Sequence, residues 1–273
     1  MLAQRPSLYP NLLDYSRSGG LRAEHAPARP LYMQTIDERI KNTYRRLMLK
    51  YIICLVSCMI TVCATMGTMA QPTGQLKIDG LESEKVGKFP SNWRTWPLRR
   101  GKTAEIYHVD KEGEMKFIRA FDDKDYSLQA MRDFNWQVDK YPYLSWRWRA
   151  KQLPTGARED NDELNDSACG VYVIFGKMSG HAMKYVWSTG LPVGQTVSRR
   201  EGKLKIRVEE SGGSNLNKWR QVSVNVPKDY SALFGKPLEK KPTGIGILTD
   251  GNATHTAAAC DYADFIISEE TTK

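Results

Sequence analysis

The part of this sequence beyond residue 70 has little cysteine, no large excess of one charge and no long apolar run. The chain has 273 residues and a formal net charge of +9, and its first 70 residues hold nine Lys and Arg against four Asp and Glu. Residues 71–273 hold 31 basic against 27 acidic side chains. So weak an excess disfavours a nucleic-acid-binding protein, which usually has a strongly basic patch. We therefore expect no nucleic-acid partner.

Motifs of known enzyme chemistry are also missing. The sequence has no Gly-x-Ser-x-Gly elbow, no phosphate-binding loop and no Glu-x-Asp-x-x-Glu pattern of laminarinase-type glycosidases. The acids of residues 159–166 lie in a polar loop with no alternation to fix them, and the histidines lack metal-ligand spacing. We expect no catalytic residues. A glycoside hydrolase or lyase with an unrecognised site is the alternative.

The first 70 residues are predicted to be a leader. Residues 1–50 are polar with four prolines and little periodicity, which is typical of disorder, and Met33 and Met48 are alternative starts. The apolar segment Tyr51–Met66 follows a basic flank, and small residues precede Gln71. This pattern, over residues 51–70, is that of a secretory signal peptide.

An uncleaved membrane anchor over residues 51–69 is the alternative, although an apolar run this short falls below the ~20 residues of a typical span. Leu55–Cys58 also matches a lipoprotein box, but the segment stays apolar beyond Cys58. We expect export to the periplasm or the extracellular space, contact with the membrane only through this segment, and a single domain over residues 71–273.

Cysteine usage agrees with export, because only Cys169 and Cys260 remain after removal of the leader. One even pair in an oxidising compartment allows a disulfide. Both cysteines precede apolar, strand-like segments, which allows them to be adjacent. Buried free cysteine is the commoner outcome, so we expect two buried free thiols, with a disulfide as the alternative.

The segment Tyr141–Lys151 organises the rest of the chain. Leu144, Trp146, Trp148 and Ala150 alternate with Tyr143, Ser145, Arg147 and Arg149. A period of two indicates a strand with one face in a core, and two tryptophans on that face indicate a central strand. The two arginines are then predicted on the opposite face.

Short strands separated by turn signals account for most of residues 100–270. Besides the central strand, we predict strands at Ala104–Val109, Met115–Ala120, Gly170–Gly176, Lys184–Ser188, Lys203–Glu209, Trp219–Val226, Gly244–Thr249 and Asp264–Ser268. Helical periodicity is almost absent, apart from a short helix at Asp229–Phe234. The pattern predicts an all-β protein, a two-sheet antiparallel β-sandwich of the jelly-roll kind.

Several tryptophan-bearing segments, taken in order, resemble the DUF3047 family of uncharacterised bacterial proteins. They are Leu144–Arg149, Asn165–Ser167, Val171–Phe175, Lys184–Trp187, Lys218–Arg220, Asp229–Tyr230, Phe234–Gly235, Leu248–Asn252 and Asp261–Tyr262. The resemblance covers nearly all of residues 79–268. It implies an exported protein with a sandwich fold akin to carbohydrate-binding modules, and it implies no reaction. The acidic loop 159–166 and the long leader depart from the family.

Two sets of side chains are candidate ligand-binding residues. One set is Arg147 and Arg149, whose charges suit carboxylate or sulfate groups. If the strand at residues 203–207 shares their sheet, its basic residues extend this cationic surface. The alternative is a solvated face paired with nearby acids. Flat aromatic rings near loops or on mixed faces are candidates for stacking on sugars, with a place in the core as the equal alternative for each. These rings are Trp93, Trp96, Tyr185 and Trp187.

Asp79 and Glu82 near one end of the domain, and Asp261 and Asp264 near the other, are candidate ligands of a structural calcium ion if the two ends pair. The alternative for these carboxylates is capping of turns, and no other cofactor is expected.

The sequence thus favours a non-catalytic, exported binding domain for a glycan or another envelope component. A structural or assembly protein of the envelope, with an envelope protein as its partner, is a further hypothesis.

Overall fold

The computed structural model describes residues 41–51, 74–176 and 181–272. The chain divides into two units, Met1–Met69 and Ala70–Lys273. Residues 41–51 form a helix where we predicted disorder, because this stretch is rich in Leu, Met, Lys and Arg, which favour helix. The predicted signal peptide or anchor lies outside the described residues apart from residue 51. In the described part of the chain, no helix has the length and apolar character needed to cross a membrane.

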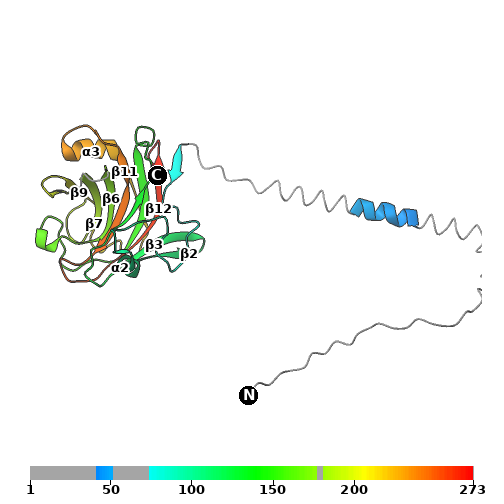
Figure 1. The fold of residues 1–273 in the computed structure, drawn as a ribbon, viewed down its shortest axis with the longest axis horizontal. Coiled ribbons are helices and arrows are strands. Elements are labelled where there is room, and N and C mark those ends of the chain that lie inside the picture. The colour runs from blue at the N-terminus through cyan, green and yellow to red at the C-terminus, as the bar shows by residue number, and fades with distance from the viewer. Residues whose placement is uncertain (1–40, 52–73, 177–180, 273) are drawn as a thin grey trace, which may run out of the picture. The chain divides into compact units, whose positions relative to one another are not determined.

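The second unit is a two-sheet β-sandwich, as predicted (Figure 1). The strands are β1 Gln75–Lys77, β2 Tyr107–Glu112, β3 Met115–Asp122, β4 Ala130–Asp133, β5 Tyr143–Gln152, β6 Ser167–Phe175, β7 His181–Ser188, β8 Thr196–Arg199, β9 Leu204–Ser211, β10 Arg220–Asn225, β11 Pro242–Asp250 and β12 Ala258–Ser268. Sheet A has the order β10-β5-β12-β3-β2, with β1 beside β12. Sheet B has the order β4-β11-β6-β7-β9-β8.

One strand pair departs from the predicted antiparallel arrangement. β7 and β9 pair in parallel, while β8 pairs antiparallel on the far side of β9. Parallel neighbours need a long connection, and the segment that carries β8 supplies it. The remaining strand pairs of both sheets are antiparallel.

Strand β5 confirms the predicted alternation. Its apolar side chains, Trp146 and Trp148 among them, are fully buried between the sheets. The Trp146 ring lies 5.5 Å from the ring of Tyr185 on β7, and the Trp148 ring lies 6.1 Å from that of Trp187. Aromatic contacts between β5 and β7 therefore join the two sheets through the core.

Strand β9 alternates as predicted, but its apolar side chains do not enter the main core. Leu204, Ile206 and Val208 belong to a second buried cluster, shared with Tyr172, Val186, Leu191 and Leu248 on the other face of sheet B. Arg207 points to the core side, where its guanidinium lies 5.1 Å from the Tyr185 ring centroid and bonds Asp229. The face opposite the core therefore has its own apolar floor.

Two helices complete the unit. The helix α2 (Arg100–Ile106) replaces the first residues of the strand predicted at Ala104–Val109, because Lys, Ala and Glu there favour helix. The helix α3 (Val226–Phe234) confirms the predicted one: the Asn225 side chain caps its start and left-handed Gly235 ends it.

The prediction of two free cysteines is wrong. Cys169 on β6 and Cys260 on β12 form a disulfide with a Cα–Cα distance of 5.5 Å. The two strands belong to different sheets, so the bond ties the sandwich together through its core. Alternation along each strand does not reveal that two cysteines on separate sheets face each other.

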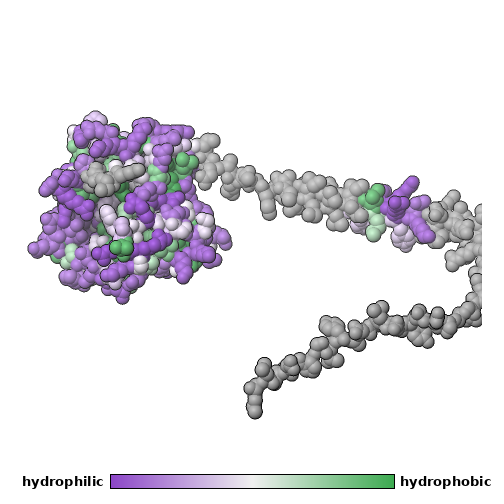
Figure 2. Space-filling model, viewed as in Figure 1, coloured by the Kyte–Doolittle hydropathy of each residue, from purple (hydrophilic) through white to green (hydrophobic). Residues whose placement is uncertain are grey.

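The surface of this unit is largely hydrophilic on the face shown in Figure 2. Apolar side chains of the described residues occupy small, separate areas of that face. Scattered apolar residues are normal on a soluble domain, whereas a broad apolar patch indicates a protein partner. This face gives no specific support to the assembly-protein hypothesis.

Candidate functional site

A groove crosses the face of sheet B that points away from the core. It consists of two pockets, with volumes of about 370 Å³ and about 290 Å³, which share Trp96, Gln129, Tyr172 and Arg200. The larger, polar pocket is also lined by Ser127, Asp162, Asn165, Lys184, Arg199, Asp250 and Asn252, over a floor that includes Leu204 and Leu248. The smaller, apolar pocket is also lined by Arg94, Met131, Ile174, Gly176, His181, Ala182 and Gly246.

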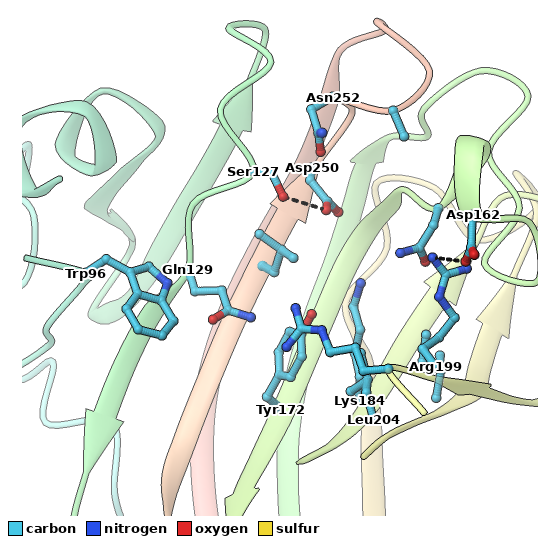
Figure 3. Close-up of a pocket in the computed structure, with 15 residues that line it drawn as sticks. Trp96, Ser127, Gln129, Asp162, Tyr172, Lys184, Arg199, Leu204, Asp250 and Asn252 are labelled. Atoms are coloured by element: carbon cyan, nitrogen blue, oxygen red, sulfur yellow. Dashed lines mark hydrogen bonds and ion pairs between the residues drawn. The ribbon is translucent and has the colours of Figure 1, made fainter. Parts of the chain in front are cut away.

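The side chains of the polar pocket come from several elements (Figure 3). Trp96 and Gln129 lie on one side, Arg199 and Asp162 lie on the other, and Tyr172 is between them. Trp96 is 55% exposed, unlike most tryptophans of this chain. The groove thus combines an accessible aromatic ring with convergent polar groups, a common composition of small-molecule and saccharide sites.

Alternation along β11 explains why the groove is open. Ile245, Ile247 and Thr249 are buried on the core side, so the intervening positions face the groove. Glycine occupies two of them, and a Cβ atom at Gly246 would come within 3.4 Å of Met131 Cγ. On the neighbouring β6, a Cβ atom at Gly170 would lie 2.6 Å from Lys184 Cε. Glycine at these positions leaves room for a ligand and for the Lys184 side chain.

The floor of the polar pocket holds a buried network of polar groups. Lys184 Nζ donates to Ser167 Oγ at 3.1 Å, and this hydroxyl in turn donates to Glu159 Oε1 at 3.2 Å. Asp250 accepts from Ser167 N at 3.1 Å and from Ser127 Oγ at 3.2 Å. Buried charges persist only when they are compensated in this way.

Burial and neighbouring charges shift the pKa of Asp250 and that of Lys184 in this network. Burial raises the pKa of Asp250 to about 6, and nearby Asp166 adds to the rise while Lys184 opposes it. Burial by itself lowers the pKa of Lys184, but Tyr172, Asp250 and Glu159 outweigh it, so this pKa lies above its usual value. Lys184 therefore stays an ammonium group. It cannot deprotonate Ser167, so this pair does not form a nucleophilic dyad.

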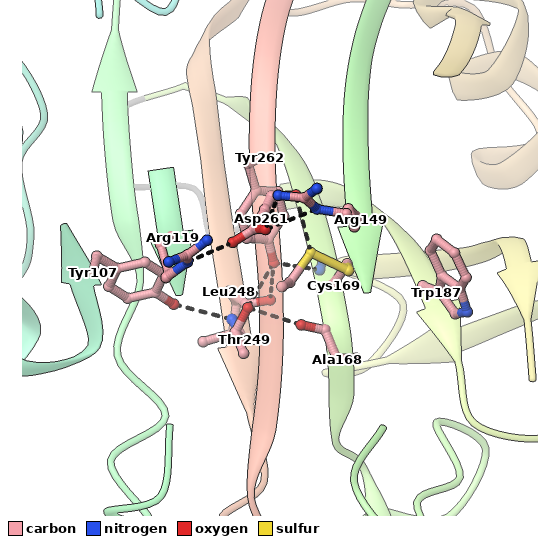
Figure 4. The surroundings of a disulfide bond; sticks show 12 residues. Tyr107, Arg119, Arg149, Ala168, Cys169, Trp187, Leu248, Thr249, Asp261 and Tyr262 are labelled. Carbon is pink, nitrogen blue, oxygen red and sulfur yellow. Dashed lines mark hydrogen bonds and ion pairs between the residues drawn. A yellow bond between two sulfur atoms is a disulfide. The ribbon is translucent and has the colours of Figure 1, made fainter. Parts of the chain in front are cut away.

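The predicted arginine residues lie on the outer face of sheet A and are ion-paired. Arg147 pairs with Asp264, while Arg149 contacts Asp261 at 2.8 Å and Glu112 at 3.1 Å. Figure 4 shows Arg149 and Arg119 both directed at Asp261. This geometry agrees with a solvated, charge-paired sheet face, which was the alternative to a cationic ligand surface.

The basic residues 203–207 do not extend that face, because β9 lies in sheet B and β5 in sheet A. The joint surface was predicted only on the condition that both strands share a sheet, and the structure does not meet this condition. Alternation along a strand does not reveal the sheet to which it belongs.

The four candidate calcium ligands are used in other ways. The two ends of the domain do pair, through β1 and β12. However, Lys77 Nζ lies where they meet, 2.8 Å from Glu82, 3.2 Å from Asp264 and 4.0 Å from Asp79. Asp261 pairs with arginines, as described above. Among the described residues, no group of three or more His, Cys, Asp or Glu side chains has a geometry that could hold a metal.

Three of the four candidate stacking rings are buried. Trp93, Tyr185 and Trp187 are at most 1% exposed. Trp93 Nε1 donates to Asp79 O at 3.0 Å, Tyr185 Oη to Asp229 at 3.0 Å and Trp187 Nε1 to Gly212 O at 3.1 Å. The core needs these rings, so the expectation that they stack on a sugar does not fit their positions. The fourth candidate, Trp96, lies in the groove.

Sandwich topology and this groove together define a β-sandwich protein with a polar-aromatic groove on one sheet. A family model described as "Protein of unknown function (DUF3047)" matches residues 91–266. The chain belongs to this family, which confirms the resemblance seen in its sequence. A search of curated proteins found no match.

Solved structures similar to this chain are distant. An agarase, AgWH50C, is 10% identical with a TM-score of 0.33, over 72% of this chain and 25% of the agarase, so this chain spans a quarter of its length. The xyloglucanase domain of NopAA from Sinorhizobium fredii is 9% identical with a TM-score of 0.38, covering 61% and 93%. CBM29_1, a carbohydrate-binding module from Piromyces equi, is 12% identical with a TM-score of 0.31, covering 72% and 90%. At this distance the functional argument rests on the groove itself.

Proposed function

We propose that this protein is an exported, non-catalytic domain that binds a glycan in the groove on sheet B. The single observation that supports it best is the exposed ring of Trp96 beside a polar pocket. The C–H face of a sugar ring packs on an aromatic ring, while its hydroxyl groups need donors and acceptors around its edge. Gln129, Asp250 and Asn252 supply both kinds of group.

Export is part of the proposal, and the disulfide between Cys169 and Cys260 supports it. Disulfides form and persist mainly in oxidising compartments such as the periplasm and the extracellular space. An envelope or extracellular polysaccharide is the natural ligand class at that location.

The test compares two exposed apolar residues of one loop. The full chain is screened on a glycan array, and the best ligand is titrated by calorimetry. We expect Trp96→Ala to weaken binding at least ten-fold, because it removes the stacking surface. Leu98, two residues away, is 104% exposed and lines neither pocket, so Leu98→Ala is the control. Equal affinities for both variants and the parent would place the site elsewhere.

Glycan hydrolysis is the second candidate, and one observation favours it. Asp250 lines the pocket, and burial raises its pKa to about 6, a value suited to a general acid. The test is release of new reducing ends from the bound glycan at pH 5 to 7. Turnover that Asp250→Asn abolishes, with binding retained, would replace the binding-domain proposal by a hydrolase. Absence of turnover on a glycan that binds supports the binding domain.

A further inference from the structure

The turn between β8 and β9 places an arginine at the edge of the groove. Arg200 has φ of 50° and the next residue, Glu201, has φ of 54°, and Gly202 N donates to Arg199 O at 3.0 Å. Two central residues with positive φ are typical of a tight hairpin turn between antiparallel strands, so the hairpin itself fixes this backbone. The side chain of Arg200 then lines both pockets of the groove.

Other cations of the groove are occupied by the protein itself. Arg94 pairs with Asp133, Arg199 pairs with Asp162, and Lys184 bonds Ser167 in the buried network. Arg200 is exposed and lines both pockets. Within the part of the chain that the structure describes, its guanidinium group makes no hydrogen bond or ion pair. Its charge and donors are therefore available to a ligand.

The surroundings of Arg200 differ between the two pockets. Asp162 and Asp250 line only the polar pocket, and no carboxylate is among the described residues that line the apolar pocket. An anionic group beside Arg200 on the apolar side therefore meets no acidic side chain of that lining. A sugar ring in the same place also reaches Trp96, which lines both pockets.

We propose that Arg200 determines specificity for an anionic glycan, by binding a carboxylate or sulfate group of a sugar that packs on Trp96. This inference rests on the proposed function and names its ligand class. A planar guanidinium presents paired donors that match two oxygens of either group, and such charge-assisted bonds are stronger than neutral ones. A neutral glycan gains none of this interaction.

The experiment compares each anionic probe with a neutral probe of the same backbone. The full chain is titrated at low salt with a galacturonate hexamer and its methyl ester, and with a sulfated galactan hexamer and the same hexamer without sulfate. We expect at least one anionic probe to bind ten-fold or more tightly than its neutral counterpart, because one charge-assisted contact is worth about that factor. The pair that shows the larger gain identifies the group as carboxylate or sulfate. The advantage should shrink as salt rises.

Three variants test the residue. Arg200→Ala should remove the advantage of the anionic probe over its neutral counterpart, and Arg200→Lys should restore part of it. Arg147→Ala is the matched control, since it removes the same charge from sheet A. It should leave the affinity for every probe unchanged. Thermal melting of each variant verifies that the fold is kept.

The outcomes separate this inference from the proposed function. Neutral glycans that bind in a Trp96-dependent way would support the groove. If the anionic probes then bind no more tightly than the neutral ones, both in the parent and in Arg200→Ala, Arg200 is a solvated rim charge. That result overturns the inference and leaves the proposed function in place. Loss of binding in Arg147→Ala with none in Arg200→Ala also overturns it, and assigns the anion to sheet A. If no probe or arrayed glycan depends on Trp96, both the proposed function and the inference fall.

Discussion

Arg147 and Trp148 are neighbours in the chain that face opposite environments. Trp148 is 0% exposed and packs against Trp146 and Trp187, whereas the Arg147 side chain is 35% exposed beside Asp264. We expect Trp148→Ala to lower the free energy of unfolding by roughly 3–5 kcal/mol, because it empties a packed interior. Arg147→Ala should cost about 1 kcal/mol or less, as for an exposed ion pair. Urea denaturation measures both values, and equal losses would contradict the register of β5.

Asp250 should make stability depend on pH in the direction opposite to most carboxylates. Burial raises its pKa from 3.8 to about 6, and Asp79 behaves in the same way. Between pH 4 and 6 the folded state keeps protons that the unfolded state releases, so the free energy of unfolding falls as pH rises. A shift of this size corresponds to about 3 kcal/mol per group.

Asp250→Asn keeps an acceptor for Ser167 N and removes the titration. We therefore expect its free energy of unfolding to fall by about 2 kcal/mol less than that of the parent between pH 4 and pH 7. Urea denaturation at each pH measures the difference. The exposed Asp123, changed to Asn, is the control and should keep the slope of the parent. A variant that follows the parent at every pH would show that Asp250 does not titrate in this range.

At the scale of elements, the disulfide joins two strands that otherwise touch only through the core. It links β6 and β12 across a sequence separation of 91 residues. Closing a loop of this length restricts the unfolded chain and stabilises the folded state by roughly 3–5 kcal/mol. We expect the double variant Cys169→Ala and Cys260→Ala to lose that amount, measured by denaturation against the oxidised parent. A change below 1 kcal/mol would show that the link contributes little.

Glycine on β11 provides a test of the groove that leaves its polar residues in place. A leucine at Gly246 would project into the apolar pocket, because this position alternates with the buried Ile245 and Ile247. We expect Gly246→Leu to weaken glycan binding at least ten-fold. Because a Cβ atom there lies 3.4 Å from Met131 Cγ, thermal melting of the variant verifies that the fold is kept. Gly101→Leu is the control, since nothing lies within 4 Å of a Cβ atom at Gly101. Unchanged affinity in Gly246→Leu would show that the ligand does not use this pocket.

Strand patterns predict elements better than they predict the layer each element faces. Two tryptophans placed one face of β5 in the core, and the structure agrees. The same alternation occurs in β9, yet its apolar residues Leu204 and Ile206 lie on the groove side. A period of two shows that the faces differ and does not show which one is the interior. Here both faces of sheet B carry buried apolar side chains, so the rule had two solutions.

At the scale of the whole molecule, the sequence predicted the sandwich and missed most of the groove. Among the described residues that line the groove, only Trp96 was a predicted stacking ring. Lys184 and Tyr172 sit within apolar runs that indicated only buried strands. Arg200 follows a strand as an ordinary turn residue. Their proximity depends on the order of strands in sheet B, which no local pattern specifies. One local signal was the alternation of glycine and isoleucine in β11, because glycine inside a strand often marks the close approach of a ligand or of another backbone.

The number of free thiols distinguishes an exported, processed chain from an unprocessed one. Three of the five cysteines, Cys54, Cys58 and Cys63, lie in the predicted signal segment, and the remaining two form the disulfide. We expect the chain, expressed from Met48 in a bacterium with an intact secretion system, to reach the periplasm with Gln71 at or near its N-terminus. The exported form should then contain no free thiol after denaturation, while the unprocessed form should contain at least three. Terminal sequencing and thiol titration of both cell fractions make the comparison. A soluble cytoplasmic protein with its leader intact would contradict the proposed export, and an exported chain that keeps residues 51–69 would identify them as an anchor.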